Sequence, residues 1–176
     1  MLATMAGAAS AAIGFILGRT IHLAIPIPMF GSLLAALPRT AILLVVLVRI
    51  NRFGTLVTAG FAEVIVKMAL GLGGTLPLAM ITPIMAGLAG EAAWFGLSPL
   101  KIKNMRLLLT GGALSGSRIL VSLLLLFLLR VPANMMWNKG ALFIGIIIAI
   151  NVVLGIVAGL IAVGLTGELK RAGVME

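Results

Sequence analysis

Residues 57–95 read VTAGFAEVIVKMALGLGGTLPLAMITPIMAGLAGEAAWF, and this stretch decides the fold. It consists of two apolar segments joined by a glycine-rich turn, and the segments contain Glu63, Lys67 and Glu91. The chain's two other acidic residues lie in its C-terminal tail. A charged side chain at the centre of a bilayer helix costs about 2.5–3.5 kcal/mol on insertion scales. Because a purely structural membrane helix does not require such a cost, these positions are the first candidates for function.

The composition predicts that the chain is surrounded by lipid. Its 176 residues are 62% hydrophobic and 10% charged, with a mean hydropathy of +1.28, whereas soluble domains are about 45–50% apolar and about 25% charged. An apolar excess of this size cannot be buried in one globular core. The apolar runs are continuous, as at 119–129 and 143–163, which favours helices over the alternating strands of a membrane barrel. The predicted class is an all-α integral membrane protein.

Six apolar segments predict a single transmembrane domain, a six-helix bundle formed by residues 1–176. The helices are expected at about residues 2–17, 29–48, 55–72, 76–97, 106–129 and 141–165. A loop is expected from Gly18 to Pro28, because two prolines close together interrupt a helix. Pro38 and Pro83 lie inside predicted helices, and each is expected to cause a kink.

The basic residues predict which side of the membrane each loop faces. Seven Lys and Arg residues lie in the loops after the second and fourth predicted helices and in the C-terminal tail, and three lie in the loops on the other side. The positive-inside rule therefore places both termini in the cytoplasm, in a multi-pass protein of the cell membrane. The formal net charge of +9 is explained by these signals. No basic run with interleaved aromatic residues is present, so nucleic-acid binding is excluded.

The chain has no cysteine and a single histidine, His22. The lack of cysteine excludes disulfides, thiolate metal sites and a cysteine nucleophile. His22 is expected to be an interfacial polar residue, because a metal site usually needs several such ligands. No metal and no cofactor are therefore predicted in this chain.

Three basic residues inside the predicted helices are candidate partners for the two acids. Lys67 follows Glu63 by one helical turn, with the acid N-terminal to the base, which favours an ion pair. Two alternatives stay open: the pair only neutralises itself, or its face lines a polar cavity where one partner also meets a ligand. Arg118 lies deep in the fifth segment and is expected to be the counter-charge of Glu63 or Glu91. Arg39 is expected either to reach the nearer surface or to face a polar cavity.

Glu91 differs from Glu63 because no basic residue lies within one helical turn of it. Its compensation is expected from another helix, from a ligand or from a bound proton. Trp94 follows Glu91 by about one turn, and Asn151 is the only strongly polar residue of the sixth segment. Both are therefore second candidates for a binding site.

The first segment carries small residues at helical spacing. Ala3, Gly7 and Ala11 fall on one stripe, and Ala8 and Ala12 fall on the neighbouring one. Small residues four apart let another helix approach closely. This surface is expected either to pack against a helix of the same chain or to dock a partner subunit.

Three short stretches carry a resemblance to a known family: FAEVI at 61–65, GLGG at 71–74 and GLAGEAA at 87–93. Together with six short helices, cytoplasmic termini and an alanine-rich first helix, they resemble the substrate-binding S component of prokaryotic energy-coupling factor (ECF) vitamin transporters. The likeness is greatest to the S components for hydroxymethylpyrimidine, the thiamine precursor. It covers roughly the first four segments, and the second half matches in topology alone.

The resemblance implies binding without catalysis. An S component captures its vitamin near the outer face of the membrane, then docks on a transmembrane coupling subunit driven by two cytoplasmic ATPases, which use ATP. Here the ligand would be thiamine or its hydroxymethylpyrimidine precursor. The rival interpretation of the residues is a stand-alone carrier or channel, or a membrane-embedded enzyme.

The resemblance also implies which residues act. The substrate-binding candidates are Glu63, Glu91, Arg118, Trp94, Asn151 and Lys67. The docking surface for the coupling subunit would be formed by Ala8 and Ala12, with Ala3, Gly7 and Ala11 beside them.

Overall fold

The computed structural model describes residues 1–24, 30–71, 80–100, 102–128 and 140–173. In these residues all regular secondary structure is helical, so the predicted all-α fold is confirmed for them. Each helix coincides with one of the predicted segments. The helices are α1 (Leu2–Ala24), α2 (Phe30–Ile50), α3 (Thr55–Ala69), α4 (Ile81–Gly96), α5 (Lys103–Leu128) and α7 (Gly140–Arg171).

α1 and α7 continue past their predicted ends, whereas α3 ends at Ala69, before the predicted residue 72. α1 continues to Ala24, so the prediction of a loop beginning at Gly18 is wrong. The first proline after this point is Pro26, which lies outside the described residues. α7 continues to Arg171, and its last turns are polar: Arg171 Nη1 lies 2.8 Å from Glu168 Oε1. Charged side chains at a helix end reach water, which lets the helix extend beyond its apolar part.

The two prolines that were expected to kink helices occupy different positions. Pro83 is the third residue of α4, where its missing N–H is not needed because first-turn N–H groups have no acceptor within the helix. Pro38 lies in the middle of α2, where it removes one backbone hydrogen bond. Pro83 therefore suits a helix start, and only Pro38 interrupts a hydrogen-bond ladder.

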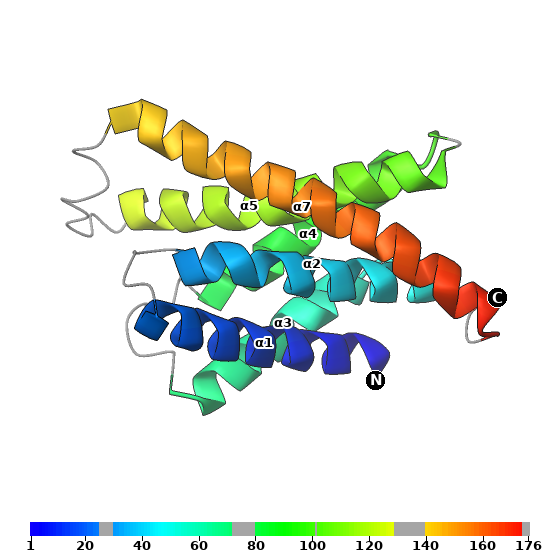
Figure 1. Ribbon diagram of the computed structural model, residues 1–176, viewed down its shortest axis with the longest axis horizontal. Helices are drawn as coiled ribbons and strands as arrows, with labels where there is room; N and C mark the ends of the chain where they lie inside the picture. The colour runs from blue at the N-terminus through cyan, green and yellow to red at the C-terminus, as the bar shows by residue number, and fades with distance from the viewer. Residues whose placement is uncertain (25–29, 72–79, 101, 129–139, 174–176) are drawn as a thin grey trace.

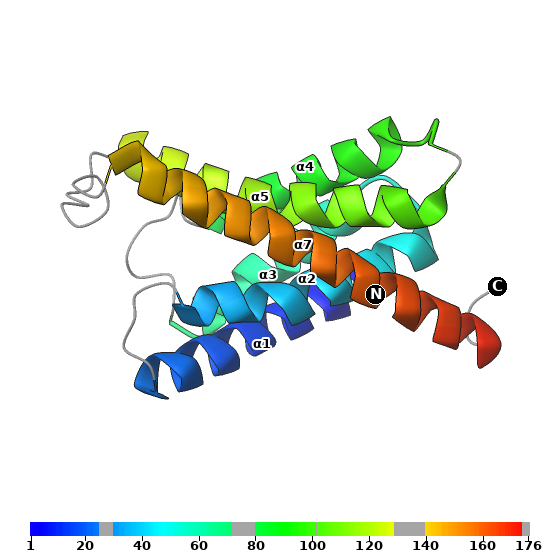
Figure 2. The same ribbon diagram turned by 45° about the horizontal axis from the view of Figure 1, so that its top comes forward.

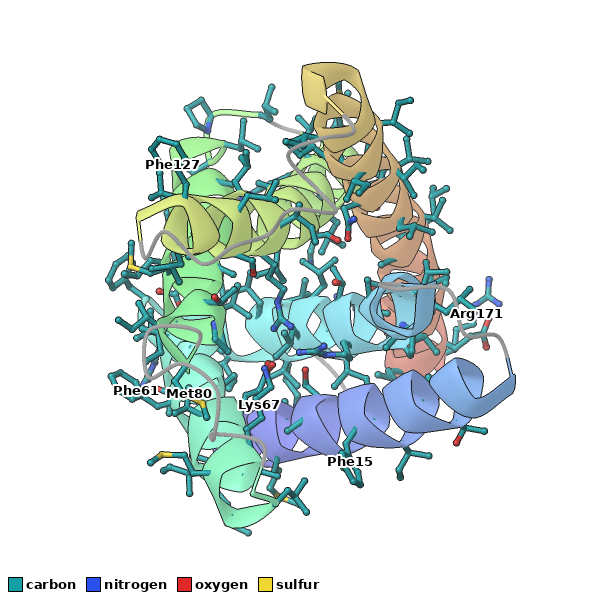
Figure 3. All side chains as sticks on the ribbon, turned by 90° about the vertical axis from the view of Figure 1, so that its left-hand side faces the viewer. Phe15, Phe61, Lys67, Met80, Phe127 and Arg171 are labelled. Carbon is teal, nitrogen blue, oxygen red and sulfur yellow. The ribbon has the colours of Figure 1, made fainter. Side chains whose placement is uncertain are left out.

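The helices are arranged around α2. It contacts α1, α3, α5 and α7, and the end-on view of Figure 3 shows the other helices surrounding it. In Figure 1, α1, α3 and α5 end on the left, where α2, α4 and α7 begin, and both chain termini lie on the right. We call the left end the distal end and the right end the terminal end.

The apolar core occupies the terminal half of the bundle. Its buried leucines include Leu44 and Leu47 near the end of α2, Leu56 at the start of α3 and Leu107 at the start of α5. Trp94, near the end of α4, belongs to the same cluster. All of these positions lie toward the terminal end because α2 and α4 finish there and α3 and α5 begin there.

α5 and α7 cross in direct backbone contact at two glycines, Gly111 and Gly155. A Cβ atom added to either glycine would overlap the carbonyl oxygen of the other. Helices approach this closely only where neither has a side chain at the crossing. Figure 2 shows α7 running obliquely across α5. The crossing fixes the position of Asn151, one turn before Gly155, relative to α5.

The surface of the bundle is rich in large apolar side chains. Ile65 on α3, Leu124 on α5 and Leu160 on α7 are each more than half exposed. Among the described residues, Lys103–Leu125 in α5 and Ile144–Arg171 in α7 are long and apolar enough to cross a membrane, by length and composition. Leu2–Leu17 is a shorter apolar helix.

Candidate functional site

Glu63 on α3 is a buried carboxylate at the centre of a charged cluster formed by α2, α3 and α5. Its side chain is 1% exposed. Oε1 forms ion pairs with Arg39 of α2 and with Lys67 Nζ of α3, the latter at 2.8 Å, and Oε2 lies 2.8 Å from Arg118 Nη2 of α5. These four residues are called the charged cluster below. The predicted Glu63–Lys67 ion pair is confirmed, and so is Arg118 as a counter-charge of Glu63.

Ser10 on α1 joins the charged cluster through hydrogen bonds. Its hydroxyl donates to Glu63 Oε2 at 3.3 Å, and it accepts from Arg39 Nε at 3.3 Å. Ser10 is fully buried. Sequence reasoning missed this residue, although a serine among the small residues of an apolar first helix is a signal that could have found it.

The composition of the charged cluster excludes the alternative that Glu63 and Lys67 only neutralise each other. A self-neutralising Glu63–Lys67 pair would have no net charge. Here Arg39 and Arg118 join the same carboxylate, so three cationic groups surround one anion. The cluster therefore carries a formal charge of +2 around a buried carboxylate.

A cavity of about 240 Å³ lies beside the charged cluster. Four of the predicted binding residues line it: Glu63, Lys67, Arg118 and Asn151. Sequence reasoning did not place five further polar residues there: Arg39, Thr40, Thr82, Ser115 and Ser122. For Arg39 the sequence left open a surface or a cavity position, and the structure places it in the cavity lining. Charged, hydroxyl and amide groups from α2, α3, α4, α5 and α7 thus converge on one hollow.

The cavity lies in the distal half of the bundle. Lys67 is in the last turn of α3, Thr82 is the second residue of α4, and Ser122 is in the C-terminal part of α5. Figure 3, which looks at the distal end, shows Lys67 between α3 and the neighbouring helices α1 and α2, whereas the labelled Phe61 lies on the outside. The polar site and the apolar core therefore occupy opposite halves of the molecule.

Glu91 lies away from this cavity and serves the start of α3. Its carboxylate accepts hydrogen bonds from the backbone N–H groups of Gly54 at 2.8 Å, Leu56 at 2.5 Å and Val57 at 3.4 Å. The N-terminal N–H groups of a helix have no acceptor within the helix, and the helix dipole favours an anion there. Gly54 has a φ of 92°, a conformation that suits glycine. The negative charge of Glu91 is therefore compensated by backbone N–H groups, a type of partner that the sequence interpretation did not consider.

Trp94 is likewise not among the residues lining the cavity. Its Nε1 donates to Asn51 Oδ1 at 2.9 Å, and the Arg106 guanidinium lies 3.7 Å from the centre of its ring. Arg106 Nε also donates to the Trp94 carbonyl oxygen at 2.5 Å. These contacts connect α4 to the start of α5 and to the α2–α3 turn at the terminal end. The structure thus places Glu91 and Trp94 in helix-connecting roles, and corrects their assignment to the same site as Glu63.

Replacing Glu91 with glutamine is expected to lower the free energy of unfolding by about 1–3 kcal/mol, because the α3 start loses a charged acceptor while remaining buried. Chemical unfolding of the purified protein in detergent measures this loss. Glu168→Gln, at an exposed position on α7, is the control and should change stability little. An unchanged unfolding free energy for Glu91→Gln would contradict the capping role.

The small residues of α1 divide into two groups. Ala3, Gly7 and Ala11 are buried, and a Cβ atom on Gly7 would overlap the carbonyl oxygen of Ala59 on α3. A partner cannot contact this stripe without displacing α3, so the structure assigns it to packing within the chain. Ala8 and Ala12 are half-buried, and the candidate docking surface narrows to them.

No family model matches this chain, and no curated protein or solved structure matches it either. In the part of the chain that the structure describes, no three His, Cys, Asp or Glu side chains are grouped as a metal ion requires. The cavity and its charged cluster are therefore the features from which function is inferred.

Proposed function

We propose that this protein is the membrane-embedded substrate-binding subunit of an ECF-type importer in a prokaryotic cell membrane. Its six helices would span the bilayer with both termini in the cytoplasm. It would capture a vitamin or vitamin precursor at the outer face. Delivery would require a transmembrane coupling subunit and two cytoplasmic ATPases that use ATP, and this chain would carry out no catalysis.

The observation that carries the proposal is a polar cavity between helices with apolar outer surfaces. Taking a charged group out of water costs several kcal/mol even when the group is paired. A bundle built only to be stable would avoid a site with three cations around Glu63. A cavity of about 240 Å³ lies beside these charged groups. A solute bound in this cavity can interact with the cations and compensate their charge.

The position of the cavity also supports capture from outside. The cavity lies toward the distal end, and the basic residues that mark the cytoplasmic side belong to the terminal end: Arg49 lies in the last turn of α2, Arg52 follows α2, and Lys170 and Arg171 end α7. The positive-inside rule places the terminal end in the cytoplasm. The cavity is then nearer to the outer face, where an importer meets its substrate.

The proposal is tested by reconstituting the chain in proteoliposomes with and without an ECF coupling subunit and its two ATPases. Radiolabelled vitamins and vitamin precursors are the probes. We expect accumulation only with the complete module and ATP. Counterflow or chemical turnover by the isolated chain would instead favour the stand-alone carrier or the enzyme and would overturn the proposal.

The docking part of the proposal has its own variants. Ala8→Leu combined with Ala12→Leu is expected to reduce copurification of the coupling subunit, because bulky residues prevent close helix approach. Ala149→Leu, at an exposed apolar position on α7, is the matched control. Thermal unfolding of both variants separates lost docking from lost folding, and unchanged copurification by the folded double variant would exclude this face of α1.

A further inference from the structure

We propose that the cavity binds a small organic anion through a carboxylate or phosphate group, and that a cation such as thiamine is not its ligand. This inference rests on the proposed function as a substrate-binding subunit and specifies the chemical class of the substrate. Three observations support it: the excess positive charge of the cavity, the fact that both carboxylate oxygens of Glu63 already have partners in the protein, and the hydrogen-bond donors that line the cavity.

The acidic residues that the structure describes do not balance the charge of the cavity. The chain contains four acidic residues. Glu63 is already in the charged cluster, Glu91 caps the start of α3, and Glu168 pairs with Arg171 at the end of α7. The fourth, Glu176, lies outside the described residues. Among the residues that the structure describes, no further carboxylate is therefore left to compensate the excess positive charge in the distal half.

Loss of a proton does not remove this excess either. Arginine keeps its proton under all ordinary conditions, so Arg39 and Arg118 remain cationic. Even a neutral Lys67 would leave two cations facing the single carboxylate of Glu63. At least one positive charge in the cavity lining needs an anion from outside the chain.

Glu63 has no capacity left for a cationic ligand. Oε1 is held by Arg39 and Lys67, and Oε2 by Arg118 and the Ser10 hydroxyl. A thiazolium or other cation entering the cavity would have to displace one of these partners and would meet like charges around it. Thiamine, which the resemblance implies as a ligand and which is a cation, does not fit this arrangement.

The donors of the lining suit an oxyanion. Guanidinium groups present planar sets of N–H donors that match carboxylate and phosphate oxygens. Arg118 Nε is buried without a hydrogen-bond partner among the described residues. Ser115 lies in the same lining, and so does Asn151, whose amide nitrogen donates to the Ile147 carbonyl oxygen at 3.0 Å and has a second N–H. A single-ring or short-chain acid is of a size to enter a hollow of about 240 Å³.

Matched ligand pairs test the sign of the ligand charge. Purified full-length protein is titrated with nicotinate against nicotinamide, with pantothenate against panthenol, with inorganic phosphate and with thiamine, and the midpoint of thermal unfolding is followed. We expect phosphate and at least one carboxylate to raise the midpoint, with the carboxylate bound at least about tenfold more tightly than its neutral analogue. Stabilisation by thiamine without any response to the anions would overturn the inference.

A variant that supplies the missing charge tests the same inference without any ligand. Ser122→Asp places a carboxylate in the lining, and Ser122→Asn is a neutral control of equal size that also loses the hydrogen bond from Ser122 to the Arg118 carbonyl oxygen. We expect Ser122→Asp to be more stable than Ser122→Asn in anion-free buffer, and its response to phosphate to be lost. Equal stability of the two variants, with phosphate responses like that of the unchanged protein, would contradict the proposal.

Lipid phosphate shares this chemistry, and the bilayer composition separates the two sources. The titrations are repeated in nanodiscs of phosphatidylcholine alone and of phosphatidylcholine with phosphatidylglycerol. A free solute gives the same response in both, whereas a lipid headgroup in the cavity suppresses the response when phosphatidylglycerol is present, which would overturn a solute site. Anion binding without ATP-driven uptake by the complete module would contradict the importer function and support the anion site. ATP-driven uptake of thiamine would support the importer function and contradict the anion site.

Discussion

Replacing Glu63 with glutamine is expected to lower the free energy of unfolding by about 3–5 kcal/mol, the effect of removing one partner from a buried ionic network. Glutamine keeps the size of the side chain but removes the only anion among Arg39, Lys67 and Arg118. The three cations then repel one another in a site where water screens them poorly. Chemical unfolding in detergent, followed by circular dichroism, measures the loss.

Two comparisons make this prediction specific. Glu168→Gln removes an acid from the exposed ion pair with Arg171 and is expected to change stability by no more than about 1 kcal/mol. Adding Lys67→Gln to Glu63→Gln removes one of the repelling charges and should restore part of the lost stability. A Glu63→Gln protein as stable as the original would show that the charged cluster does not contribute as described.

Gly155→Leu is expected to destabilise the protein by about 3 kcal/mol, at the upper end for overpacking. Any side chain at this position meets the backbone of α5 at Gly111, which cannot move aside as a flexible side chain does. α7 would have to separate from α5, and Asn151 would move away from the cavity with it. Unfolding midpoints measure the first effect, and loss of ligand-induced stabilisation measures the second.

Gly145 provides the matched control because it lies on the same helix and a Cβ atom there meets nothing within 4 Å. Gly145→Leu should be close to neutral in stability. Substitution by alanine sharpens the contrast: Gly145→Ala is expected to stabilise by up to about 1 kcal/mol through helix propensity, whereas Gly155→Ala should destabilise. Equal effects of the substitutions at Gly145 and Gly155 would show that the backbones of α5 and α7 lie further apart at their crossing than the structure indicates.

The sequence was sufficient to predict the helices and to find the unusual acids, because both are local signals. Continuous apolar runs identify helices wherever they occur, and a carboxylate in such a run is conspicuous. The i,i+4 spacing of Glu63 and Lys67 was likewise enough to predict their ion pair, since one helix fixes their geometry. Helix ends were less predictable: α1 runs on to Ala24 because nothing before Pro26 forbids it.

The partners across helices could not be predicted, since they depend on how each helix is rotated in the bundle. Arg118 fitted Glu63 and Glu91 equally well as a counter-charge. Glu91 looked unpaired because only side chains were considered, and its acceptor role depends on α4 bringing it to the N–H groups of Leu56 and Val57. The same rotation turns Gly7 of α1 onto α3 and buries Ala11, which removes both from any external surface.

The partners of Glu63 come from helices made both before and after it, which has a consequence for biosynthesis. In the proposed six-span membrane protein, Arg39 emerges from the ribosome earlier than Glu63, so α2 alone would bring an uncompensated guanidinium to the translocon, where a central arginine is poorly accepted. α2 and α3 are therefore expected to leave the translocon together as a hairpin, because the ion pair with Glu63 on α3 lowers the cost of inserting Arg39 on α2. Arg118 arrives last, and α5 then adds its positive charge to a pair that is already in place.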